Sequence, residues 1–90
     1  MVFLISYTLH KTGQNYADLQ EAIKKISGVW WHHTTSVWLV STQMSAKQIF
    51  DYLSPFIDNN DDLMVFKLQN EWHGKLADST NYDWLRARTF

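Results

Sequence analysis

Eleven consecutive residues, Trp30 to Val40, constrain the fold of this chain more than any other segment. They contain three of the five tryptophans and two of the four histidines, with no glycine or proline among them. β-branched and aromatic side chains favour the pleated, half-buried surface of a sheet. The segment therefore predicts two paired strands joined by a tight polar turn near Thr34 and Thr35.

The composition indicates one small globular domain. The chain has 90 residues, 46% of them hydrophobic and 16% aromatic, and a domain of this size buries about 60–65% of its unfolded surface. So high an aromatic share suggests that a partner buries part of it. The absence of cysteine excludes a disulfide framework, a thiolate zinc site and a cysteine nucleophile. A net charge of −1 provides no overall basic field for nucleic acid.

No segment of the sequence has the pattern of a targeting or membrane segment. The apolar run at the N-terminus, Val2 to Ile5, is too short for a signal peptide, and no run of about 18 apolar residues occurs. We therefore expect a cytoplasmic protein without a membrane partner.

Apolar spacing predicts the first strand and helix. Residues 2–9 form a nearly continuous apolar run, which is typical of a strand buried on both faces. From Tyr16 to Ile26, apolar residues recur every three or four positions, which predicts an amphipathic helix. Asn15 is its expected N-cap and Gly28 its stop.

The second half of the chain carries a capping box, Ser45 to Gln48, at the start of a second helix. The apolar stripe predicted for this helix consists of Ile49, Phe50 and Leu53. Pro55 is expected to end it. The remaining predicted segments are a solvated loop at 58–62, a last strand at 63–68 and a short helix from Ser79 through Arg86.

The resulting order, β-α-β-β-α-β, predicts an α+β protein with a ferredoxin-like fold. We expect a four-stranded antiparallel sheet with two helices on one face, formed by residues 1–69, and a C-terminal extension at 70–90. Apolar residues occupy both faces of the predicted strands, yet two helices cover only one face. The extension, a second copy of the chain, or both must cover the other face, and we expect a homodimer.

Three segments resemble the Cas2-like group of small ferredoxin-fold proteins, which includes CRISPR-associated and VapD-type proteins. They are Leu4-Ile5-Ser6-Tyr7, Ser36-Val37-Trp38-Leu39 and Asp62-Leu63-Met64-Val65-Phe66-Lys67-Leu68. The chain also resembles small bacterial and phage proteins of the SinR-like kind, which share a His-Lys-x-Gly-Gln-Asn-Tyr loop and a Trp-Trp-His hairpin. The resemblance covers roughly residues 1–69 and implies the fold, dimerisation and a nucleic-acid or defence setting.

Two departures from the family pattern bear on catalysis. Cas2-like nucleases carry an aspartate directly after the tyrosine of the first strand, where this chain has Thr8, and their glutamate in the third strand is here Leu39. A neutral hydroxyl is a poorer Mg²⁺ ligand than a carboxylate. We therefore expect no metal-dependent nuclease activity, no metal site and no cofactor.

The end of the first strand offers the best candidate site in the sequence. Tyr7, Thr8, His10 and Lys11 are expected to form a small polar binding pocket, in which His10 would be a weak candidate for a general base in RNA cleavage. A polar loop with a solvated histidine is the simpler alternative.

The hairpin offers a second set of candidates. His33 is the other weak catalytic candidate, but His32 and His33 point to opposite faces of a regular strand and so do not ligate one metal together. Trp31 and Trp38 are expected binding residues that stack nucleobases. Core or dimer packing of these rings is the favoured alternative, because no basic surface surrounds them.

Together these features predict a homodimeric Cas2-like binding or interaction module of a bacterial or phage nucleic-acid or defence system. Two alternatives stay open: a metal-independent VapD-like endoribonuclease, and a phage-type protein–protein inhibitor or adaptor. Whether nucleic acid or protein is bound is left open by the sequence.

Overall fold

The computed structural model describes residues 1–9, 16–34, 36–73 and 82–90, and the elements below are those of these residues. In chain order they are β1 (Val2–Thr8), α1 (Tyr16–Lys24), β2 (Trp30–Thr34), β3 (Val37–Ser41), α2 (Ala46–Leu53), the 3-10 helix η1 (Ser54–Phe56), β4 (Asp62–Lys67) and α3 (Tyr82–Arg86). The expected Asn15 cap, residue Thr35 of the turn and the start of the last helix at Ser79 lie outside the described residues.

The four strands form one sheet in the order β2-β3-β1-β4. Every neighbouring pair is antiparallel. The predicted α+β class and the four-stranded antiparallel sheet are thereby confirmed. β1 lies between β3 and β4, which explains its continuous apolar sequence, since a central strand with both faces covered has no solvent-facing side.

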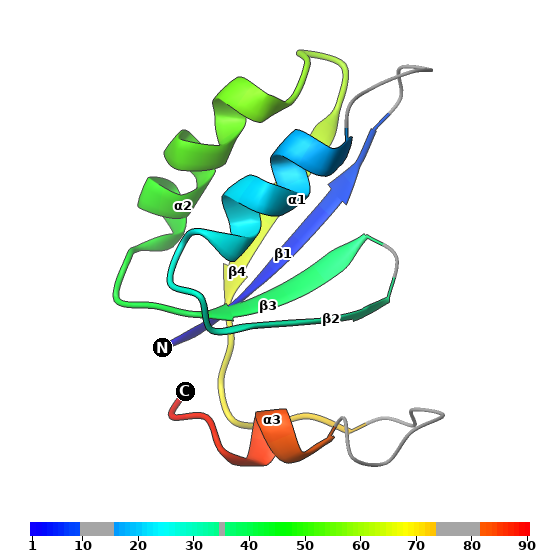
Figure 1. Cartoon of the computed structure of the whole chain (residues 1–90). Coiled ribbons are helices and arrows are strands. Elements are labelled where there is room, and N and C mark those ends of the chain that lie inside the picture. The colour runs from blue at the N-terminus through cyan, green and yellow to red at the C-terminus, as the bar shows by residue number, and fades with distance from the viewer. Residues whose placement is uncertain (10–15, 35, 74–81) are drawn as a thin grey trace.

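Helices α1 and α2 lie on the same face of the sheet (Figure 1). Alternate residues of the strands face them, because successive side chains of a strand point to opposite sides. The core between the helices and the sheet contains these buried residues: Phe3, Ile5, Tyr7, Leu19, Ala22, Ile23, Trp38, Val40, Ile49, Leu53 and Leu63. Burial of this apolar surface is the main stabilising contribution to the fold.

The opposite face of the sheet is partly covered by the C-terminal segment. Leu85 of α3 is buried against Val2 and Leu39, which point away from α1 and α2. Trp84 and Phe90 pack around this second cluster. The chain itself thus supplies part of the cover that the two-sided apolar pattern requires.

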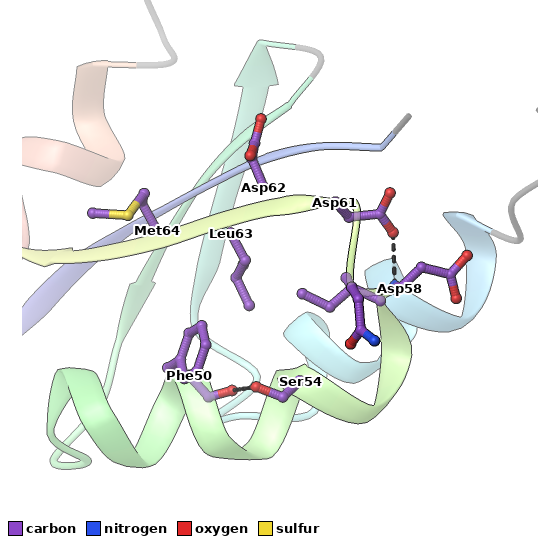
Figure 2. Close-up of a pocket in the computed structure, with 9 residues that line it drawn as sticks. Phe50, Ser54, Asp58, Asp61, Asp62, Leu63 and Met64 are labelled. Atoms are coloured by element: carbon purple, nitrogen blue, oxygen red, sulfur yellow. Dashed lines mark hydrogen bonds between the residues drawn. The ribbon is translucent and has the colours of Figure 1, made fainter. Parts of the chain in front are cut away.

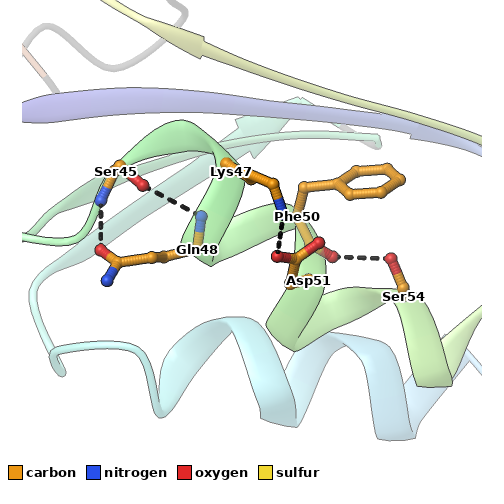
Figure 3. A network of polar contacts seen from close by, with 6 residues as sticks. All are labelled: Ser45, Lys47, Gln48, Phe50, Asp51 and Ser54. Carbon is orange, nitrogen blue, oxygen red and sulfur yellow. Dashed lines mark hydrogen bonds and ion pairs between the residues drawn. The ribbon is translucent and has the colours of Figure 1, made fainter.

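Helix α2 begins where the sequence predicts. The Ser45 hydroxyl accepts a hydrogen bond from the Gln48 backbone N–H at 3.1 Å, and the Gln48 side chain accepts one from the Ser45 N–H at 2.8 Å (Figure 3). This reciprocal pair satisfies two backbone donors at the helix start. After α1, Gly28 has the positive φ of 73° expected of a glycine that ends a helix.

The predicted apolar stripe of α2 needs one correction. Ile49 and Leu53 are buried as expected, but Phe50 is 42% exposed. Ile49 and Leu53 are four residues apart and therefore lie on the same side of the helix, whereas Phe50 is turned about 100° from Ile49. Its ring reaches the edge of the sheet rather than the core.

Candidate interaction surface at the fourth strand

Of the four residues in the predicted polar pocket at the end of β1, the structure describes Tyr7 and Thr8. Tyr7 is 3% exposed, and its hydroxyl accepts a hydrogen bond from the Trp38 indole N–H at 3.3 Å. Tyr7 is therefore a core residue. Thr8 is exposed at the last position of β1. His10 and Lys11 lie outside the described residues.

The tryptophans of the hairpin divide between the two faces of the sheet. Trp38 is 1% exposed, and the His32 ring stacks on it with centroids 3.8 Å apart. Trp38 is therefore packed in the core, where a nucleobase cannot stack on it. Core packing is the alternative to nucleobase stacking that the sequence favours. Trp31 faces the other side, in the cluster that contains Leu85. The second histidine candidate, His33, belongs to β2.

Trp31 also lines a hollow on that opposite face. Its volume is about 330 Å³, and its walls are mostly apolar. The aromatic residues Trp31, Trp72 and Phe90 surround an aliphatic floor that includes Leu4 and Leu39. Trp31 is thus the predicted binding residue that lies beside an open hollow, although the surrounding surface is apolar and not basic.

Thr8 has an acidic neighbour that sequence spacing did not reveal. The register of β1 and β4 places Asp62 directly across from it. The nearest acidic residue along the chain, Asp18, lies in α1. Within the described residues, no three His, Asp or Glu side chains are arranged to hold a metal ion. One carboxylate beside a hydroxyl supplies less negative charge than the carboxylate clusters that hold divalent ions.

Large apolar side chains are exposed along β4. Met64 is 54% exposed and Phe66 is 49% exposed, both on the face away from α1 and α2. Phe50 of α2 adds a third half-exposed side chain on the helix side. β4 ends the sheet order and has β1 as its one neighbouring strand among the described residues. Exposed apolar groups therefore flank the open edge of the sheet on both sides.

A hollow of about 500 Å³ lies between α2 and β4 at this edge. Figure 2 shows Phe50 and Leu63 pointing toward each other across it, whereas Asp62 points to the other side of the strand. The loop before β4 supplies an acidic rim, in which the Asp61 carboxylate accepts a hydrogen bond from the Asp58 backbone N–H at 2.8 Å. Apolar walls with an acidic rim suit a cationic side chain that has an aliphatic stem.

The position of Phe50 follows from how α2 is held. The capping box fixes the first turn, and an ion pair of 2.7 Å joins Lys47 to Asp51 along the exposed side. At the other end, the Ser54 hydroxyl donates to the Phe50 carbonyl oxygen at 2.8 Å (Figure 3). With Ile49 and Leu53 anchored in the core, Phe50 is turned to the β4 edge.

Comparison of the chain with protein-family models, with curated proteins and with solved structures finds no match. Among the described residues, no helix is long and apolar enough to cross a membrane. The function is therefore inferred from the chain's own residues and their placement.

Proposed function

We propose that this protein is a cytoplasmic, homodimeric interaction module with a ferredoxin-like fold of the Cas2-like kind. Its setting would be a bacterial or phage nucleic-acid or defence system. The element order β1-α1-β2-β3-α2-β4 and the sheet order β2-β3-β1-β4 support the fold assignment. The three segments that carry the family resemblance fall in β1, in β4 and at the start of β3.

The observation that carries the proposal is the exposure of Met64, Phe66 and Phe50 around the β4 edge. Single exposed apolar residues are ordinary on protein surfaces, but neighbouring ones mark contact sites. A strand edge also presents unpaired backbone donors and acceptors, which favour pairing with another strand. Association at this edge would bury the exposed apolar side chains and pair the backbone groups of the strand that face the edge.

The residues at the end of β1 favour binding over metal-dependent hydrolysis. Thr8 occupies the position at which the family's metal ligand is expected, and it is exposed opposite Asp62. The Thr8 hydroxyl carries no negative charge, and the single carboxylate across from it, that of Asp62, is a weaker site for a divalent ion than a cluster of carboxylates. The proposed role is therefore recognition, with the sheet edge as the self-contact.

Light scattering over a range of protein concentrations tests the proposal. We expect the wild-type mass to approach twice the 10.7 kDa of one chain as concentration rises. A double variant, Met64→Ser with Phe66→Ser, should remain monomeric because it loses the exposed apolar groups. Tyr52→Ser is the matched control, since Tyr52 is 37% exposed and lies on α2 beside α1. A wild-type protein that stays at 10.7 kDa at every concentration would contradict dimerisation.

A further inference from the structure

The backbone of β4 alternates between groups that bond to β1 and groups that face the open edge. The Leu68 N–H donates to the Val2 carbonyl oxygen at 2.9 Å. In an antiparallel ladder, every second residue bonds to the same neighbour. Phe66 and Met64 are paired with Leu4 and Ser6, so their backbone groups turn toward β1. The N–H and C=O groups at positions 63, 65 and 67 consequently face the edge.

Resting on the proposed homodimer, we propose that β4 pairs antiparallel with β4 of a second copy, across a two-fold axis at Val65. A two-fold axis normal to the sheet keeps each residue on its own face, so opposed residues must be an even number of positions apart. With Val65 opposite itself, Leu63 pairs with Lys67 of the second copy. Edge groups at 63, 65 and 67 all gain partners, and two four-stranded sheets become one.

On the face away from α1 and α2, this register pairs the exposed apolar groups. Met64 lies opposite Phe66 of the second copy, and Phe66 lies opposite Met64. Contacts of this kind between opposed side chains are the unit by which sheets gain stability, and sulfur–aromatic contacts are favourable. Both side chains are about half exposed in the single chain. The pairing covers them without a further partner.

On the helix side, the register brings a cation to the acidic hollow. Lys67 is exposed and makes no ion pair with any residue that the structure describes. It lies on the helix side because Leu63 and Val65, four and two positions earlier, pack against the core on that side. Across the axis, Lys67 lies opposite Leu63 and diagonal to Asp61, a separation that long side chains span. The hollow lined by Phe50, Leu63 and the aspartates thereby receives an aliphatic stem and an ammonium group.

Cysteine cross-linking tests the register directly, because the chain has no cysteine of its own. Met64→Cys and Phe66→Cys chains are mixed in equal amounts and oxidised. We expect a disulfide-linked heterodimer, since opposed residues meet disulfide geometry. When Met64→Cys is oxidised alone, we expect no disulfide-linked dimer, because Met64 is not opposite itself. Efficient cross-linking of Met64→Cys with itself would contradict the Val65 axis.

Proline substitution tests the edge pairing itself. Val65→Pro removes one N–H that faces the edge and is not needed by β1, so the single chain should retain its circular dichroism spectrum. We expect loss of the dimer in light scattering, whereas Val65→Thr, which keeps the N–H, should remain dimeric. If the wild type and Val65→Pro are both dimeric and the cysteine variants give no mixed cross-link, the edge pairing is overturned but the homodimer stands. A monomeric wild type would overturn both. If Val65→Pro fails to fold, the cross-linking result decides.

Discussion

Trp38 contacts both the other strand of the hairpin, β2, and the central strand β1. Its ring packs against two rings of the neighbouring strand β2, those of His32 and Trp30, with centroid separations of 3.8 and 5.2 Å. Its indole N–H, the one polar group of the side chain, is satisfied by the Tyr7 hydroxyl. A buried tryptophan thus gains apolar burial without leaving an unpaired donor, which is the condition for placing so large a ring in a core.

Trp38→Ala should lower the free energy of unfolding by about 3–5 kcal/mol, because it leaves a large cavity in the core. Trp30→Ala serves as the control, since Trp30 is 37% exposed and should cost far less. Urea unfolding followed by circular dichroism measures both. Equal losses for the two variants would contradict the core position of Trp38.

Tyr7→Phe isolates the hydrogen bond from the packing. The change keeps the ring but leaves the Trp38 N–H without its acceptor, so we expect a loss of about 1–3 kcal/mol. Tyr52→Phe removes a hydroxyl from a ring that is 37% exposed and should leave stability nearly unchanged. Thermal unfolding of the two variants side by side gives the comparison, and no difference between them would show that the buried hydroxyl contributes nothing.

Among the helices and strands, the sequence predicts those features best that depend only on neighbouring residues of the chain. Ser45 and Gln48 predict the start of α2 from a four-residue spacing alone, because a capping box is satisfied within the chain segment itself. The sequence predicts Phe50 on the buried stripe of α2, but the structure exposes it, because helical periodicity identifies an apolar side chain and not whether a strand edge lies beside it. The proximity of Thr8 and Asp62 was missed for a similar reason: strand register depends on the whole sheet and not on spacing along the chain.

Ser45→Ala should cost about 0.5–2 kcal/mol, because it removes the acceptor for the Gln48 N–H at the start of α2. Lys47→Ala breaks an exposed ion pair in the same helix and should cost less, about 0–1 kcal/mol. Chemical denaturation of both variants checks the order. A larger loss for Lys47→Ala would reverse the assignment of the cap as the stronger of the two contributions.

Leu85→Ala tests whether α3 is part of the stable structure. Leu85 is 8% exposed against Val2 and Leu39, so its truncation should cost about 2–5 kcal/mol. Arg86→Ala is the neighbouring control, because the Arg86–Asp83 ion pair is exposed and contributes little. An unchanged unfolding midpoint for Leu85→Ala would mean that the C-terminal helix does not hold the open face of the sheet in solution.

At the scale of the whole molecule, the strands carry apolar residues on both faces of the sheet, and the two helices α1 and α2 cover only one of these faces. α3 covers the part of the other face where Val2 and Leu39 lie, and leaves Met64 and Phe66 exposed at the β4 edge. The sequence indicated that cover was needed but not how the C-terminal segment and a second copy would divide it. That division depends on where α3 packs in three dimensions, which no local pattern encodes.

The central claim is that the protein acts by association and not by metal-dependent cleavage. The most direct measurement incubates purified protein with labelled RNA and DNA, with Mg²⁺ or Mn²⁺ and with EDTA, and resolves the products. We predict no metal-stimulated cleavage, because Thr8 and its counterpart in a dimer lack the charge that holds and orients a divalent ion. Metal-stimulated cleavage that survives stringent purification and disappears on changing Thr8 would contradict the account. Cleavage that persists in EDTA and depends on His10 or His33 would contradict it as well, in favour of a metal-independent ribonuclease.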